Sequence, residues 1–166
     1  MNINEALDMS ARHYKTMRED DPESDLMAFL NAVEEDDRMS IYAIGMPGHP
    51  VQYLPVIIEG MERKPMILVF QSDTYHFVAK NKGEWDESYV GRLHELYAQG
   101  HPNVTDALAI SALDSEGKKA MVTFPDRVVD GKVEWLESER ADHRDVEHIE
   151  GRVFDALEAG MRHWHG

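Results

Sequence analysis

The 166-residue sequence contains no cysteine. This absence excludes disulfides, thiol nucleophiles and every metal site with a thiolate ligand. No apolar run approaches the ~18–20 residues that a membrane-spanning helix requires, and the N-terminus lacks the basic start of a signal peptide. We therefore expect a soluble, cytoplasmic protein that does not enter a membrane.

Common cofactor and catalytic motifs are also absent. The sequence contains no glycine-rich dinucleotide-binding motif, no P-loop, no serine-hydrolase nucleophile motif and no EF-hand loop. A chain of this length buries enough surface to fold without a metal or a disulfide. We expect no cofactor.

Basic residues are scarce, since 17 Lys and Arg against 32 Asp and Glu give a net charge of −15. The excess is concentrated in residues 1–37, which hold eleven acids and three bases. Such a chain repels phosphate backbones and anionic bilayers, so we expect neither direct nucleic-acid binding nor membrane binding. A basic protein partner is compatible with this charge, and so is a simple role in solubility.

Residues 3–18 are expected to form a helix, because apolar residues recur there at steps of three or four. Asn2, followed three residues later by Glu5, has the pattern of a capping box. Residues 24–35 are expected to form a second helix with apolar residues on one side. Because the connection is short, residues 1–37 are predicted to form an acidic helical hairpin.

Four consecutive acids end the second expected helix, namely Glu34, Glu35, Asp36 and Asp37. The C-terminus of a helix is its negative end, so each acid there costs some tenths of a kcal/mol. One interpretation is an acidic contact surface, which makes these four the candidate partner-binding residues. The alternative is a solvated acidic terminus without a binding role.

The middle of the chain has strand composition. Residues 39–44 and 51–59 are rich in β-branched residues, although Pro55 makes the second run an edge strand, a bent strand or a strand that gives way to a short helix. Residues 66–70 are apolar without alternation, which indicates a strand that is covered on both faces at the centre of a sheet. Strand character is interrupted at residues 71–73 and then resumes.

The remaining sequence is expected to contain two helices and a β-meander. A helix is predicted over residues 86–99, and three strands of a meander follow it. Asp130 and Gly131 predict the last hairpin turn, because both residue types tolerate a positive φ. Residues 142–164 carry apolar side chains at helical spacing and predict one long terminal helix.

Together these elements predict one α+β domain over residues 1–166. After the helical hairpin, residues 38–137 would form a mixed or antiparallel sheet of about five to seven strands, with the helix at 86–99 inserted and the meander at its C-terminal end. The helix over 142–164 would pack on this sheet or against a second copy of the chain.

Three segments carry a family resemblance. They are the short strand at residues 41–45, the apolar strand with an acidic-aromatic end at residues 66–75, and the acidic-glycine turns of the meander. In this layout, residues 25–137 resemble a loose group of small actinobacterial and bacteriophage proteins of uncharacterised function. The chain departs from that group in having Thr74 and Tyr75 where an Ala-Trp pair is common. The resemblance implies an accessory or host-directed role and assigns no chemistry.

The sequence contains nine histidines and no cysteine, so a metal site would have to use His and carboxylate ligands. His143 and Glu147 are four residues apart and would share one face of the terminal helix. His163 and His165 lie near the end of that helix. These four are candidate metal ligands, and the alternative is that they belong to the polar face of an amphipathic helix.

Four further residues are candidate catalytic groups. His49 and His101 each lie in a Gly-His-Pro loop, and two such loops could meet at one sheet edge. Asp73 could orient His76 as a general base, although residues three apart on a strand project to opposite faces unless a turn intervenes. The alternative is that glycine and proline form turns in which the histidines occupy exposed positions.

The sequence favours an acidic interaction domain that binds another protein over an enzyme, and the charge is compatible with a basic partner. A small His/Asp-dependent hydrolase, with or without a metal, is the first alternative. A structural or assembly component that forms a stable oligomer is the second. A homodimer is compatible with each of these functions.

Overall fold

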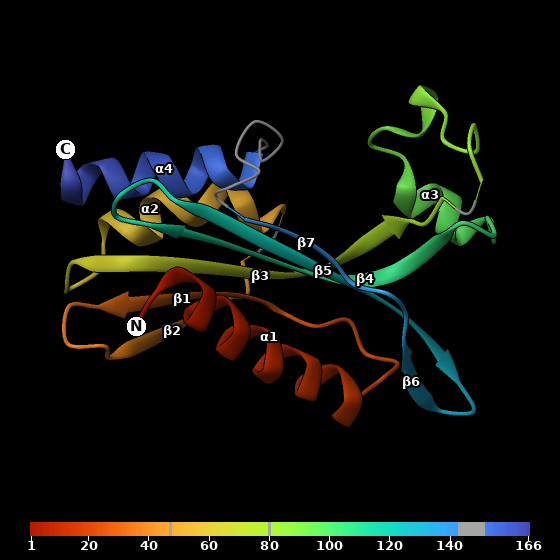
Figure 1. Ribbon diagram of the computed structural model, residues 1–166, viewed down its shortest axis with the longest axis horizontal. Coiled ribbons are helices and arrows are strands. Elements are labelled where there is room, and N and C mark those ends of the chain that lie inside the picture. Colours follow the sequence, from red (N-terminus) through yellow and green to blue (C-terminus); the bar gives the residue numbers. More distant parts are fainter. Residues whose placement is uncertain (47, 80, 143–151) are drawn as a thin grey trace.

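The computed structural model describes residues 1–46, 48–79, 81–142 and 152–166 (Figure 1). In these ranges, a seven-stranded antiparallel sheet is covered by α1 (Ile3–Asp20) on one face and by α2 (Leu54–Glu59) and α4 (Arg152–His165) on the other. The strands are β1 (Ala28–Glu34), β2 (Met39–Ile44), β3 (Pro65–Phe77), β4 (Val104–Asp114), β5 (Lys119–Val129), β6 (Lys132–Trp135) and β7 (Glu139–Asp142). The short helices η1 (Pro50–Tyr53), η2 (Glu87–Tyr89) and α3 (Leu93–Ala98) lie in the connections.

The strand order is β2-β1-β3-β4-β5-β6, and β7 also pairs with β5. The two longest neighbours, β3 and β4, pair from Ile67 opposite Asp114 to Phe77 opposite Val104. Toward their far end, Figure 1 shows these two strands extending past the helices to α3. The expected α+β class, the antiparallel sheet and the C-terminal meander are confirmed.

The apolar centre of β3 is covered on both faces, as its lack of alternation predicted. Leu68 and Phe70 point to the core beneath α2 and α4, whereas Ile67 and Val69 point to the core beneath α1. Because side chains alternate along a strand, a strand between two helical layers needs apolar residues at every position. Residues 71–73 do not interrupt this strand, since β3 continues to Phe77.

The first helix is confirmed, together with its cap. The Glu5 backbone N–H donates to Asn2 Oδ1 and the Asn2 N–H donates to Glu5 Oε2, both at 2.9 Å. This reciprocal pair satisfies two backbone donors that a helix start leaves open. The stripe that includes Leu7, Ala11 and Tyr14 is buried against the sheet.

The prediction of a second helix over residues 24–35 is wrong, because residues 28–34 form the strand β1. β1 lies between β2 and β3 and beneath helices on both faces, so six of its seven residues are buried. A strand of this kind carries apolar residues on both faces, including positions that match helical spacing. Residues 1–37 therefore form a helix and a strand, and the predicted helical hairpin does not exist.

Two other predictions required correction. Residues 51–59 contain no strand, because η1 occupies their start, but the short helix that Pro55 left open is present as α2. Pro55 lies in the first turn of α2, where its missing N–H costs no hydrogen bond. The single helix expected over residues 86–99 is instead the pair η2 and α3. In both segments, short helices replace the longer regular element that the pattern indicated.

The terminal helix packs on the sheet, as expected. Phe154, Leu157 and Met161 of α4 share a core with Leu68 and Phe70. However, the helix does not begin at residue 142, because Asp142 belongs to β7 and pairs with Ala120. Residues 143–151 lie outside the described residues. The final hairpin turn is confirmed, with φ of 52° at Asp130 and 75° at Gly131.

Within the described residues, no helix combines the length and the apolar character needed to cross a membrane.

Candidate functional site

The four acids proposed as partner-binding residues lie at the end of β1 and in the turn to β2, and three of them are paired with bases. Arg63 Nη1 lies 3.3 Å from Glu34 and 3.8 Å from Asp36. The N-terminal ammonium lies 2.7 Å from Asp37. Glu34 is buried, and it also accepts a hydrogen bond from Ser40.

Glu35 is the fourth acid of this turn. Arg38, which follows the turn, lies 3.7 Å from Asp36. The structure thus places the candidates at a β-turn of mixed charge and not at a helix terminus. Most of the negative charge expected on this surface is compensated within the chain.

Uncompensated negative charge lies instead in residues 19–25, which comprise the last two residues of α1 and the start of the connection to β1. We term this segment the acidic connector. All five of its acids are exposed: Glu19, Asp20, Asp21, Glu23 and Asp25. The hydrogen bonds described for them come from the neutral donors Trp135 Nε1, to Glu19 at 2.8 Å, and Ser24 Oγ, to Asp21 at 2.6 Å. Among the described residues, no base forms an ion pair with these acids.

The connector begins beside a buried ion cluster at the end of α1. Arg18, only 3% exposed, donates to Asp73 Oδ1 at 2.5 Å, and its Nε lies 3.7 Å from Asp126. Asp73 also accepts the Leu26 N–H at 3.0 Å. This arrangement fixes both ends of the connector to the sheet, because Arg18 precedes it and Leu26 follows it.

The carboxyl groups of this cluster have perturbed acidities. Burial raises the pKa of Asp126 to about 6, against the opposing effect of Arg18. Asp106, which lies directly opposite Asp126 in the β4–β5 register, raises the pKa of Asp126 further. Burial also raises the pKa of Asp73. With a pKa of about 6, the Asp126 carboxyl can exchange a proton near neutral pH. Because the residue is 1% exposed, however, it presents no surface to a substrate.

Tyr97 is hydrogen-bonded to Asp106, the acid opposite Asp126. Its hydroxyl donates to Asp106 Oδ2 at 3.0 Å, and burial followed by this hydrogen bond raises the pKa of Tyr97 to about 12. The ring of Tyr75 packs against that of Tyr97 in a tilted arrangement, with a centroid distance of 4.9 Å. These tyrosines stay protonated near neutral pH, so they act as hydrogen-bond donors and apolar surface.

The candidate catalytic residues are not brought together. Asp73 binds Arg18, whereas His76 Nε2 lies 3.3 Å from Glu139. Because β3 is continuous between them, the turn that would have joined Asp73 to His76 does not form. His49 accepts the N–H of Val51 at the start of η1.

His101 lies elsewhere in the fold, in an aromatic cluster on the connections around α3. Its ring centroid is 5.7 Å from that of Phe77 and 5.5 Å from that of Tyr89. Trp85 completes the cluster, at 5.1 Å from Phe77. Since these rings contact one another, they form a partly exposed aromatic cluster in which His101 has a packing role.

The candidate metal ligands are not assembled in the part of the chain that is described. His165 Nε2 lies 2.7 Å from the carbonyl oxygen of Pro65, and His163 packs edge-on against Trp164. His143 and Glu147 lie outside the described residues. Elsewhere in the described ranges, no group of three His, Asp or Glu side chains has the arrangement of a metal site.

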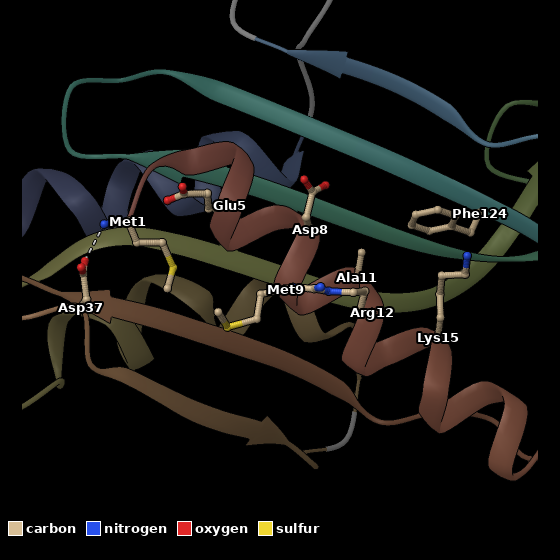
Figure 2. Close-up of a pocket in the computed structure, with 9 residues that line it drawn as sticks. All are labelled: Met1, Glu5, Asp8, Met9, Ala11, Arg12, Lys15, Asp37 and Phe124. Atoms are coloured by element: carbon tan, nitrogen blue, oxygen red, sulfur yellow. Dashed lines mark hydrogen bonds and ion pairs between the residues drawn. The ribbon is translucent and has the colours of Figure 1, made fainter.

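A surface groove of about 710 Å³ follows α1 (Figure 2). Figure 2 shows that its lining residues lie on both sides of the helix, with Met1 and Met9 toward Asp37 and with Asp8 and Lys15 toward Phe124. Lys15 Nζ lies 4.5 Å from the Phe124 ring centroid. The groove is lined by acids, among them Glu5 and Asp8, and by the bases Arg12 and Lys15, so it favours no ligand of one charge.

A second groove, of about 670 Å³, runs along the outer strand β2. Its lining includes Ile41 and Tyr42 on one side and Met61 and Arg63 on the other. Ile41 is 54% exposed. Sequence reasoning identified β2 as a strand but had no signal for its place at the sheet margin, because strand order depends on long-range pairing.

We found no match to this chain among models of protein families, among curated proteins or among solved structures.

Proposed function

We propose that this chain is an acidic protein-interaction domain that binds a basic protein partner through the acidic connector. The observation that carries the proposal is the contrast between two acidic segments. The turn at residues 34–37 is largely neutralised by Arg38, Arg63 and the N-terminus, whereas the five connector acids are exposed and form no ion pair among the described residues. A net charge of −15 gives the molecule a negative field that attracts a basic partner.

The neighbourhood of the connector also supports this function. Trp135 donates to Glu19, which places an aromatic ring beside the acids. Burial raises the pKa of Tyr75, and the carboxylates of Asp106 and Asp25 raise it further. Tyr97 lies against Tyr75 and is exposed. Trp and Tyr contribute large contact areas to protein interfaces, and acids beside them steer a basic partner to that area.

A binding measurement with a defined basic probe tests the proposal. The probe is a fluorescently labelled oligolysine peptide, and binding is followed by anisotropy at low and at physiological ionic strength. The test variant is D20N/E23Q/D25N, and the matched control E35Q/D36N/D37N changes the net charge equally. Because exposed ion contacts contribute about 0.2–1 kcal/mol each, we expect the test variant to bind about tenfold more weakly at low salt and the control to lose much less.

Equal losses of affinity in the two variants would show that only the total charge matters. A larger loss of affinity in the control would indicate that the turn at residues 34–37 is the binding site. Either result would overturn the proposal. Thermal unfolding followed by circular dichroism checks that both variants remain folded, as expected for substitutions of exposed side chains.

A further inference from the structure

The outer edge of β2 has unused hydrogen-bonding groups. β2 pairs with β1 on one side, and within the described ranges no strand pairs with its other side. The Glu34 N–H donates to the carbonyl oxygen of Arg38 at 2.8 Å, which sets the alternation of the ladder. In that alternation, the backbone groups of Met39, Ile41 and Ala43 face away from β1.

This edge also lacks the features that protect sheet edges in monomeric proteins. Exposed edges usually carry charged residues or proline, or are very short, because an open edge pairs readily with another strand. β6 and β7 at the opposite margin follow this rule, since each has four residues and both contain charged side chains. β2 has six residues without a charge or a proline, and Ile41 at its centre is half exposed.

The local charge at this edge permits a second copy as its occupant, although the molecule as a whole is acidic. Two molecules with a net charge of −15 repel each other, so they can associate only through a surface that is not itself negative. The acids nearest to β2 are held by Arg38, Arg63 and the N-terminus. The groove along β2 is lined by two acids, Glu34 and Glu62, and by two bases, Arg38 and Arg63, so the charge beside this edge is balanced.

The pattern of β2 is also complementary to itself. In an antiparallel pair centred on Ile41, the two Ile41 residues lie opposite each other and Met39 lies opposite Ala43 of the second copy. All of these residues have outward-facing backbone groups, so the ladder of one copy matches the ladder of the other. The paired side chains are uncharged, and a β-branched pair at the centre stabilises such a ladder.

We propose that two copies of this chain form a symmetric dimer by antiparallel pairing of their β2 edges, which joins the two sheets into one. In Figure 1, β2 forms the lower margin of the sheet, away from α4 and α3. The acidic connector is not part of this contact. The dimer is therefore independent of binding to a basic partner.

Molar mass measured by light scattering after size exclusion, over a range of protein concentrations, tests the dimer. The variant I41K places two lysines opposite each other at the centre of the pair. The variant I41P removes an outward N–H that β1 does not use, a position at which an edge strand tolerates proline. The control V56K makes the same change of charge at a residue of α2 that is 71% exposed.

We expect the wild type and V56K to dimerise, and both Ile41 variants to raise the dissociation constant at least tenfold. Added salt is expected to strengthen the dimer, because it screens the repulsion between the two acidic molecules. A wild type that is monomeric at its highest soluble concentration would overturn the proposal. A dimer unaffected by I41K in a folded protein would do so as well, since it would have to use another surface.

Discussion

At the scale of single residues, buried charge is the feature with the clearest consequences. Asp126 lies beneath α1 with Arg18 as its counter-ion at 3.7 Å, too far for a hydrogen bond of normal length. Neither of its carboxylate oxygens has a hydrogen-bond partner in the structure. A buried carboxylate that is poorly solvated favours its neutral form, which explains why its pKa is raised to about 6.

The folding stability is expected to depend on pH through Asp126. Because its pKa is higher in the folded state than the ordinary 3.8, its contribution to stability is fully present below about pH 4 and is lost as the pH rises through about 6. In D126N this group no longer titrates. The free energy of unfolding of D126N relative to wild type should therefore rise by about 1–3 kcal/mol between pH 4 and pH 7.

Urea unfolding at a series of pH values measures this difference. D130N is the matched control, because Asp130 is an exposed acid in the turn that ends β5. We expect the stability of D130N to run nearly parallel to that of wild type. Parallel curves for D126N would show that Asp126 is not the titrating group.

Arg18 is the residue that holds the end of α1 on the sheet. Replacement by Met leaves Asp73 and Asp126 buried without their counter-ion, and breaking a buried ion pair in this way costs about 3–5 kcal/mol. We therefore expect R18M to lower the urea midpoint strongly. R12M on the exposed face of the same helix is the control, and it should change the midpoint little. Equal midpoints in the two variants would contradict a structural role for Arg18.

At the scale of elements, the contact between α2 and α4 depends on one glycine. A Cβ added at Gly160 would lie 2.6 Å from both Cβ and Cδ1 of Ile58, closer than side-chain carbons approach each other. Gly in a helix interior normally costs about 1 kcal/mol relative to Ala. Close packing of the two helices offsets this cost here.

The variant G160A should therefore destabilise the protein by about 1–3 kcal/mol, although the same change usually stabilises a helix. The reverse change at the neighbouring position, A159G, is the control and should show only the ordinary helical cost of about 1 kcal/mol. Thermal or urea unfolding measures both variants. A gain in stability for G160A would mean that α2 and α4 pack less closely than described.

The elements also differ in how far their local sequence determines them. α1 is encoded locally by its cap and its stripe of apolar residues, so it was predicted almost to its boundaries. β1 was mistaken for a helix because a strand buried on both faces has no alternation and its apolar residues fit either period. Only its pairing with β2 and β3 excludes the helix.

At the scale of the whole molecule, the two proposed interactions respond to salt in opposite directions. Binding of a basic partner to the acidic connector weakens as ions screen attraction, whereas pairing of two acidic copies strengthens as ions screen repulsion. The two surfaces lie at different parts of the fold, since the connector begins at the end of α1 and the β2 edge lies beyond β1. Salt dependence can therefore separate them in one preparation.

The distribution of compensated charge could not be predicted from the sequence. Arg63 is 29 residues from Glu34, and the N-terminus is 36 residues from Asp37. No local sequence pattern predicts contacts over such separations. The pairing of Arg18 with Asp73 spans 55 residues. For this reason, residues 34–37 were proposed as a free acidic surface and the connector was not.

Local sequence determined the class of the fold, the first helix, the apolar centre of β3 and the turn at Asp130 and Gly131, because caps, burial patterns and turn residues act between near neighbours in the chain. It also determined the net charge. Tertiary structure alone decided which acids keep their charge exposed, which strand forms the open edge and why residue 160 must be glycine. Each of these depends on contacts between segments that are distant in sequence and meet only after the sheet has formed.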